Sequence, residues 1–359
     1  MNYKKSEQLL DRALKSIPLG SQTFSKSLTQ YPRGVSPFFI EKGKGAKVWD
    51  VDGNKYIDFV NSLAAVTLGY CDKNVDEAVQ KQMQNGVTFS LPHCLEMEVA
   101  EKLIDIIPCA EKVRFAKNGT DATSASIRIA RAYTGKDHIA VCGYHGWQDW
   151  YIGSTTRDLG VPKAVKELTH KFEYNNIESL EKIFQERELA CVIMEPMNAE
   201  YPQDNFLEKI KTLAHKNDAL LIFDETITGF RYSLGGAQAL FSVIPDLATF
   251  GKGMANGFPL SAVVGSNEIM QKVEDIFFSG TFGGETLSLA AANAVIDKYK
   301  KDNVPKYLND LGNYLLKKLN QLIIKEGLND VFRTSGHPAW SFLQVNMKPF
   351  TPRKIRGEK

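Results

Sequence analysis

The chain has 359 residues and carries 44 lysines and arginines against 42 aspartates and glutamates, which gives a formal net charge of +2. Hydrophobic residues make up 43% of the chain and charged residues 24%, which are ordinary proportions for a globular protein. The near-neutral balance argues against a dedicated nucleic-acid binder, and no apolar run approaches the ~20 residues that cross a membrane.

The first 60 residues predict one helix, one loop and a small sheet. Apolar residues recur at helical spacing over 5–17, and Pro18 ends the predicted helix. Residues 20–37 have turn chemistry and predict an ordered loop. Three short β-like pieces follow within 38–60, with DVDGNKY as a turn between two of them. This segment therefore predicts a small antiparallel sheet.

From about residue 75 the pattern alternates between helices and strands. Helices are expected over 75–85, 95–107, 121–133, 176–187, 206–217, 284–300 and 303–325. Strands are expected over 113–116, 138–142, 190–194, 220–223, 247–250 and 262–265. Strands that are apolar throughout, separated by helices, predict an α/β fold with a mostly parallel sheet covered on both faces. FRTSGHPAWSFLQVNM then predicts a turn and one strand, and KPFTPRKIRGEK is a basic, polar end.

The five cysteines are odd in number and widely spaced, and no CxxC pair occurs. Neither a disulfide framework nor a metal site is therefore expected. The amino-terminal MNYKKSEQLLDRALKS lacks the apolar stretch of a signal peptide. We expect reduced thiols and a cytoplasmic protein that binds neither nucleic acid nor membrane.

Two segments place glycine and threonine at the start of a predicted helix. Gly119 and Thr120 follow the strand VRFA, and a helix N-terminus with a close main chain suits a phosphate group. Thr281 lies in the similar segment SGTFGGE. An ordinary capped helix explains either segment equally well, with Thr120 as the N-cap in the first.

Three more motifs follow predicted strands. Tyr144 comes after HIAVC, where an aromatic ring can stack on a flat ligand, and a core aromatic is the alternative. Asp224 ends the apolar LLIFD, and a carboxylate there needs a cationic or functional partner; a salt bridge or a helix cap is the alternative. Lys252 stands between two glycines and is a candidate for a desolvated amine that forms a Schiff base, with an ordinary loop lysine as the alternative.

Taken together and in chain order, these five motifs supply what pyridoxal 5′-phosphate (PLP) requires. The phosphate needs N–H donors, the ring needs a stacking face, the ring nitrogen needs an anion and the carbonyl carbon needs a lysine. A nicotinamide dehydrogenase is disfavoured because no GxGxxG follows an early strand.

Over about residues 34–300 the stretches VWDVDGNKYIDF, NGTDATSASIRIARAYTGKDHI, GYHGWQDW, LLIFDETITGFR, PDLATFGKGMANGFPLSAVVG and GTFGGETLSLAAANAVI follow one another. In these stretches the sequence resembles the class III (ω-type) aminotransferases, and most of all their glutamate-1-semialdehyde 2,1-aminomutase branch. The resemblance implies the fold type I of PLP-dependent transferases and a homodimer with shared active sites. It also implies a small-molecule amino donor and a carbonyl acceptor as substrates.

The resemblance implies a role for individual residues. Lys252 matches the Schiff-base lysine, and Asp224 matches the carboxylate that binds the pyridine nitrogen. The other implied cofactor contacts are Gly119 and Thr120 at the phosphate, Tyr144 and Thr226 on the two ring faces, and Thr281 at the phosphate in the neighbouring subunit. The implied substrate residues are Ser21, the strand-end Glu195, and Glu200. A carboxylate-binding arginine is expected as well, with Arg33, Arg231 and Arg333 as candidates.

Two departures from the family pattern qualify the function. The segment MNAEYPQDNFL after Glu195 is short, and Glu200 takes the approximate place of an asparagine near the cofactor's phenolic oxygen. This favours an aminotransferase with a different substrate, with the aminomutase as the alternative. The family continues beyond a strand such as SFLQV, so a PLP-binding protein with impaired turnover is the second alternative. The expected units are an amino-terminal part over 1–60, a PLP-binding domain over 61–300 and an incomplete small domain over 301–359.

Overall fold

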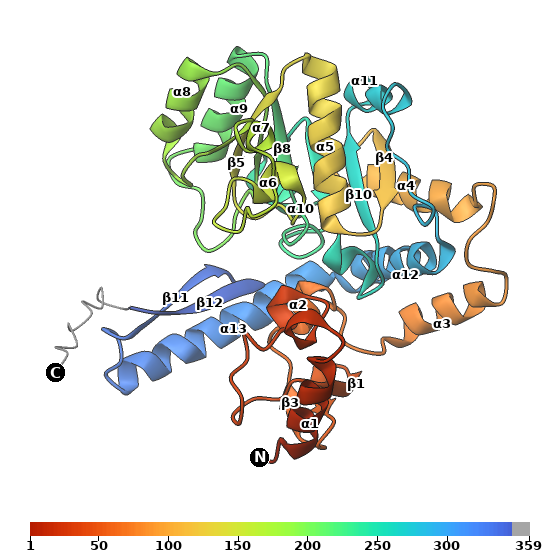
Figure 1. Cartoon of the computed structure of the whole chain (residues 1–359), viewed down its shortest axis with the longest axis vertical. Coiled ribbons are helices and arrows are strands. Elements are labelled where there is room, and N and C mark those ends of the chain that lie inside the picture. The colour runs from red at the N-terminus through yellow and green to blue at the C-terminus, as the bar shows by residue number, and fades with distance from the viewer. Residues whose placement is uncertain (347–359) are drawn as a thin grey trace.

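The computed structural model describes residues 1–346, so the end of the expected 301–359 unit lies outside the described residues. In Figure 1 a large sheet with its helices forms the upper part of the molecule. The amino-terminal elements, two long helices and a hairpin form the lower part. The division of the chain into three units stays a prediction.

The large sheet has seven strands in the order β4-β10-β9-β8-β7-β5-β6. Its strands are β4 (Lys112–Ala116), β5 (His138–Cys142), β6 (Thr169–Lys171), β7 (Leu189–Met194), β8 (Leu220–Asp224), β9 (Leu247–Phe250) and β10 (Ser261–Gly265). Strand β10 runs antiparallel to both β4 and β9, and the pairs from β9 through β6 are parallel. The prediction of an α/β fold with a mostly parallel sheet is confirmed.

Helices cover both faces of this sheet because its central strands are apolar on both sides. Every residue of β7 and β8 is buried. Helix α5 (Gly119–Thr134) packs on one face, and α8 (Ile177–Glu186) and α9 (Phe206–Lys216) pack on the other (Figure 1). Each Leu or Ile side chain buried in these layers contributes about 1.5–3 kcal/mol. The layers therefore form a rigid frame for the residues at the strand ends.

The other helices surround this frame and extend below it. They are α1 (Lys4–Ala13), α2 (Asn61–Ala64), α3 (Lys73–Met83), α4 (Cys94–Ile106), α6 (Asp149–Ile152), α7 (Lys163–Lys166), α10 (Gly236–Phe241), α11 (Asn267–Met270), α12 (Thr286–Asp302) and α13 (Val304–Lys325). The long helices match the predicted ones to within a few residues. The short helices α6, α7, α10 and α11 were not predicted, because four to six residues carry too little periodicity.

Two small antiparallel sheets complete the fold. The predicted amino-terminal sheet is confirmed as β1 (Ile40–Lys44), β2 (Lys47–Asp50) and β3 (Lys55–Ile57). The prediction of one strand near the carboxyl end is wrong, because β11 (Phe332–His337) and β12 (Trp340–Val345) form a hairpin. The β11 sequence FRTSGH has one large apolar residue, so its strand pattern is weak and its pairing with β12 decides its structure.

Four adjacent parallel strands each end at or just before a residue that is expected to act chemically. Tyr144 follows β5, Glu195 follows β7, Asp224 ends β8 and Lys252 follows β9. The carboxyl ends of parallel strands meet at one edge of a sheet, and this edge is where open α/β folds bind ligands. The topology therefore gathers these residues although more than 100 residues separate the first from the last.

Candidate active site

Lys252 begins a short 3₁₀ turn directly beyond β9, in a left-handed conformation with φ of 39°. Burial lowers the pKa of Lys252 below its ordinary value; the nearby Asp224 and Glu195 carboxylates oppose the shift, and Arg231 adds to it. No hydrogen bond or ion pair to its amine occurs within residues 1–346. Lys252 is thus a largely buried amine that loses its proton more readily than a surface lysine.

The Asp224 carboxylate is buried and surrounded by donors. Its Oδ1 accepts the Thr226 hydroxyl at 2.5 Å, the Thr226 amide at 3.1 Å and the Thr249 hydroxyl at 3.0 Å. Burial alone raises the pKa of Asp224, but the His145 hydrogen bond and charge, with the Thr226 bonds, outweigh it and hold the pKa below its usual value. Asp224 is therefore an anion despite its burial.

His145 is the ring that pairs with the buried Asp224. Its Nδ1 lies 2.9 Å from Asp224 Oδ2, and its Nε2 lies 3.2 Å from the Cys142 carbonyl oxygen. Both ring nitrogens thus lie within hydrogen-bond distance of an oxygen atom. The Asp224 Oδ2 has no second donor among the described residues, which leaves a lone pair for another N–H.

The amino end of α5 packs closely against Thr226 and the chain before Lys252. A Cβ atom on Gly119 would lie 2.9 Å from the Thr226 methyl carbon, and one on Gly251 would lie 3.4 Å from the same carbon. Glycine at 119 is required for this approach. The amides of Gly119 and Thr120 donate to no acceptor in the described chain and belong to the first turn of a helix, where an anion is favoured.

Two glycines fix the segment that carries Tyr144 and His145. Gly143 and Gly146 have φ of 112° and 108°, which disfavours other residues. A Cβ on Gly146 would lie 2.2 Å from Thr120 Oγ1, and one on Gly143 would lie 2.6 Å from Glu195 Oε2. The segment is thereby pressed against both the α5 amino end and the end of β7.

Glu195 holds this segment by its main chain. Its Oε2 accepts the Tyr144 amide at 3.0 Å and the Asn198 side-chain amide at 3.1 Å. Burial raises the pKa of Glu195, and the Asp224 charge adds to the increase. The Tyr144 ring is 61% exposed and meets the edge of Tyr151 at 5.7 Å between centroids, so one of its faces remains open to a ligand.

A strained turn precedes the segment that Arg231 binds. The four residues of α2, Asn61–Ala64, all have left-handed φ values of 55°, 51°, 56° and 69°. Each such residue costs about 1–2 kcal/mol, so the run stores roughly 4–8 kcal/mol. Strain of this size persists only where surrounding contacts impose it, and it concentrates at functional sites.

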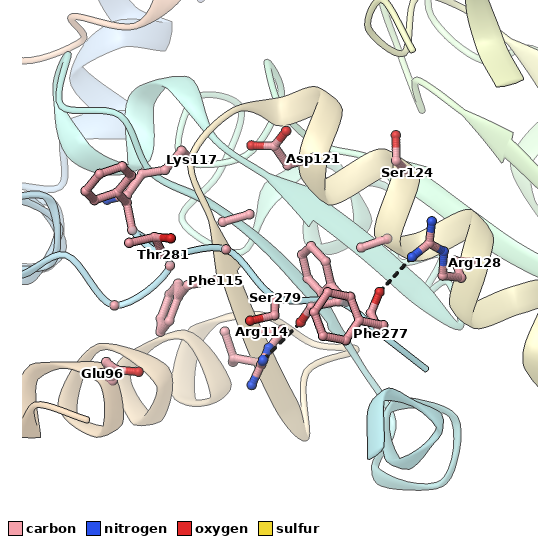
Figure 2. Close-up of a pocket in the computed structure, with 18 of the residues that line it drawn as sticks. Glu96, Arg114, Phe115, Lys117, Asp121, Ser124, Arg128, Phe277, Ser279 and Thr281 are labelled. Atoms are coloured by element: carbon pink, nitrogen blue, oxygen red, sulfur yellow. Dashed lines mark hydrogen bonds between the residues drawn. The ribbon is translucent and has the colours of Figure 1, made fainter. Parts of the chain in front are cut away.

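Thr281 lies apart from this cluster. It lines a cavity of about 650 Å³ with Lys117, Asp121 and Phe277, and Lys252 and Asp224 do not line that cavity. Figure 2 shows the cavity between β4, the amino-terminal half of α5 and the segment that carries Thr281. Within one chain, Thr281 therefore lines a cavity separate from the lysine.

The structure thus brings together most of the predicted residues. Lys252, Asp224, Thr226, Gly119, Thr120, Tyr144 and Glu195 form one continuous cluster. Ser21 bonds within its own loop, to the Thr23 carbonyl at 3.2 Å. Glu200 is exposed in the connection from β7 to α9, and its charge contributes to the raised pKa of Tyr174, for which burial is the main cause.

Sequence reasoning missed the role of His145 and of Glu225. Glu225 is fully buried and accepts the Thr228 hydroxyl at 2.5 Å and the Ala237 amide at 2.6 Å, so it fixes the chain that follows Asp224. The flanking Gly143 and Gly146 were the available signal for His145, because they mark a main chain in close contact with its surroundings. No pattern signalled Glu225.

The three candidate arginines are engaged elsewhere. Arg33 pairs with Glu7 and Asp11 of α1. Arg333 donates to Gln344 across the hairpin at 2.6 Å. Arg231 is 4% exposed and donates to main-chain oxygens.

Within residues 1–346, no group of three or more His, Cys, Asp or Glu side chains is arranged to hold a metal ion. None of the helices in that range has both the length and the apolarity to cross a bilayer.

A model of the class III aminotransferase family matches residues 30–337. A glutamate-1-semialdehyde 2,1-aminomutase of Francisella philomiragia is 39% identical over 357 aligned residues, which cover 92% of this chain and 79% of that protein. A 3-aminobutyryl-CoA aminotransferase of Cloacimonas acidaminovorans is 39% identical over 314 residues, which cover 85% and 75%. The PLP internal aldimine form of the Sphingopyxis sp. MTA144 FumI protein superimposes with a TM-score of 0.89 at 27% identity, over 95% of this chain and 83% of that one.

Proposed function

The chain belongs to the class III aminotransferase family and is a PLP-dependent enzyme of fold type I, and we propose that it transfers an amino group between two separate small molecules. The observation that carries the proposal is the acidic connection from β7 to α9. Glu195 and Glu200 both lie on it, and both add to the raised pKa of Tyr174, for which burial is the main cause. An acidic connection that begins at Glu195 in the site and carries the exposed Glu200 disfavours a substrate that presents a carboxylate towards it.

The residues present fit PLP. Asp224 has a free lone pair for a protonated ring nitrogen, the α5 amides are free for phosphate, and the Lys252 amine is buried without a partner. When bound, PLP supplies a carbonyl that captures amines and a protonated ring that accepts electrons from the substrate carbon. We assign Lys252 to the carbonyl, Asp224 to the ring nitrogen, and Gly119 and Thr120 to the phosphate.

The side chains of this chain then divide the work. Asp224, kept ionised by His145, holds the proton on the ring nitrogen. Tyr144 and Thr226 confine the ring between them, and Glu195 keeps the Tyr144 main chain in place. Lys252 carries a proton between the substrate carbon and the cofactor carbon, which requires an amine that is uncharged for part of the cycle. Its lowered pKa suits this role.

We also propose that two copies of the chain complete each site. Thr281 borders a surface with exposed aromatic residues, since Phe277 is 82% and Phe282 59% exposed. An exposed apolar patch of this kind marks an interface. A second copy seated there would place Thr281 at the phosphate in its neighbour, as the family resemblance implies.

A single-turnover experiment separates aminotransferase from aminomutase. With an amino donor alone, we expect the cofactor absorbance of the loaded protein to change once, in an amount equal to the sites, and a carbonyl acceptor to restore it. Catalytic conversion of glutamate 1-semialdehyde to its isomer without a second substrate would instead establish the aminomutase, which the 39% identity to the Francisella relative favours as the second candidate.

A further inference from the structure

Arg231 is a buried cation without an anionic partner. Its Nε donates to the Ile227 carbonyl at 3.1 Å, and its Nη2 donates to the Ala64 carbonyl at 2.6 Å and to Thr67 Oγ1 at 3.4 Å. No carboxylate pairs with it in the described part of the chain. A buried charge held only by neutral oxygens is costly, so its retention calls for a specific role.

The Ala64 carbonyl that Arg231 binds ends the left-handed turn Asn61–Ala64. At the start of the turn, the Asp58 carboxylate accepts the Val60 and Asn61 amides, both at 2.9 Å. The turn is therefore held at both ends, by Asp58 and by Arg231. Four consecutive L residues leave this conformation readily unless such contacts hold them.

Thr67, three residues beyond the turn, lies against the main chain of Gly253, the residue after Lys252. A Cβ on Gly253 would lie 2.9 Å from Thr67 Oγ1, the atom to which Arg231 donates. On its other side the Arg231 guanidinium lies 5.5 Å from the centre of the Trp340 ring in β12. Arg231 thus contacts segments before, within and after the large sheet domain, and one of these, at Thr67, lies beside Gly253.

We propose that Arg231 is a positioning residue for amino transfer, which clamps the left-handed turn and Thr67 against the main chain of Gly253, directly after Lys252. The inference rests on the proposed role of Lys252. The clamp fixes the turn, the amine and the β12 hairpin in one arrangement. It also places a positive charge near the amine, opposite the negative charges of Asp224 and Glu195.

Because Arg231 is charged, the proposal predicts a change in the pKa of Lys252. A purely structural role of Arg231 would not cause that change. Burial is the main cause of the lowered pKa of Lys252, Asp224 and Glu195 oppose it, and Arg231 reinforces it. Removal of the Arg231 charge takes away one of the two causes that lower the pKa of Lys252. That pKa therefore rises, although burial still holds it below its ordinary value. The pH at which Lys252 reacts then rises as well.

The test compares Arg231→Met and Arg231→Lys with the natural protein and with Arg187→Met, whose arginine is exposed at the end of α8. Two quantities are measured on the full chain: the pH midpoint for capture of PLP by Lys252, and amide hydrogen exchange over 61–67. Arg231→Met is expected to raise the midpoint and to speed exchange at least about tenfold. Arg231→Lys keeps the charge, so it speeds exchange and leaves the midpoint in place.

The outcomes distinguish this inference from the proposed function. If the natural protein does not capture PLP at Lys252, the proposed function fails. If it does, and exchange over 61–67 is unchanged in both Arg231 variants, the clamp is refuted. If Arg231→Met does not fold, the Arg231→Lys exchange rates still decide the matter, and rates equal to those of Arg187→Met overturn the proposal.

Discussion

At the scale of single residues, the site depends on two buried ionisable groups: one stays charged, and the other favours its neutral form. Asp224 stays ionised because His145 and the Thr226 and Thr249 hydroxyls surround it. Lys252 has no comparable partners in residues 1–346, so burial favours its neutral form. An anion that stays charged and an amine that sheds its proton are what a carbanion-stabilising site requires.

Replacing Asp224 with asparagine is expected to slow the donor half-reaction about 100-fold or more, because the ring nitrogen loses the anion that keeps it protonated. Stopped-flow absorbance of the cofactor measures this rate. Asp158→Asn is the control, since Asp158 pairs with Lys166 at 2.6 Å on a loop outside the site. Equal rates in the Asp224→Asn and natural proteins would remove Asp224 from the mechanism.

The lowered pKa of Lys252 also has a consequence for stability. Between this lowered value and the ordinary value of about 10.4, the unfolded chain binds a proton that the folded chain does not. The free energy of unfolding attributable to Lys252 therefore rises with pH across that window. Urea unfolding at a series of pH values should show this rise in the natural protein and a smaller one in Lys252→Met. Parallel curves for the two proteins would contradict the shift.

At the scale of elements, the amino end of α5 is positioned by glycines on a neighbouring loop. Gly146 faces Thr120 so closely that a Cβ would lie 2.2 Å from its hydroxyl oxygen. At the other end of α5, Gly135 is also left-handed, with φ of 70°, but nothing lies within 4 Å of a Cβ there. Substitutions at these two glycines therefore distinguish the cost of backbone strain alone from the cost of strain combined with a steric clash.

Gly146→Ala is expected to cost about 3 kcal/mol or more, from left-handed strain together with overpacking. Gly135→Ala should cost only about 1 kcal/mol, from strain alone. Urea unfolding measures both, and equilibrium dialysis of PLP should show weaker binding in Gly146→Ala alone, because Thr120 must move. Similar binding losses in the two variants would show that Thr120 does not hold the phosphate.

The elements that could be predicted are those whose own sequence decides them. The strand 138–142 was predicted with its observed bounds, because its apolar run is buried within the sheet. Lys252 and Asp224 could be proposed as site residues from local motifs. Strand β11 was missed because its own residues carry a weak strand pattern and its pairing with the adjacent β12 decides its structure. The His145 contact with Asp224 and the Arg231 contact with the turn Asn61–Ala64 join residues distant in sequence, so no local pattern could reveal them.

At the scale of the whole molecule, the proposed site requires two copies of the chain. Within one copy, Thr281 lines a cavity with the exposed Phe277, and Lys252 does not line that cavity. Placing it at a phosphate needs a neighbour. A dimer interface at this surface would account for the exposed aromatic residues. It would also explain why Thr281 does not join the Lys252 cluster within one copy.

Mixing two inactive variants tests the shared site. Lys252→Ala lacks the amine, and Thr281→Ala lacks the threonine that its neighbour would use. Random exchange of subunits should restore about a quarter of the natural activity, because half of the dimers are mixed and each holds one complete site. No recovery under conditions where sedimentation shows exchanged dimers would contradict sharing of Thr281.

The central claim is that PLP binds at Lys252, and reduction followed by peptide mapping tests it most directly. The full chain is loaded with PLP, reduced with borohydride, digested and examined by mass spectrometry, beside Lys252→Ala treated in the same way. We predict one phosphopyridoxyl group, on the peptide that contains Lys252, and no stoichiometric label in the variant. Stoichiometric label on another lysine, with Lys252 unmodified, would contradict the account.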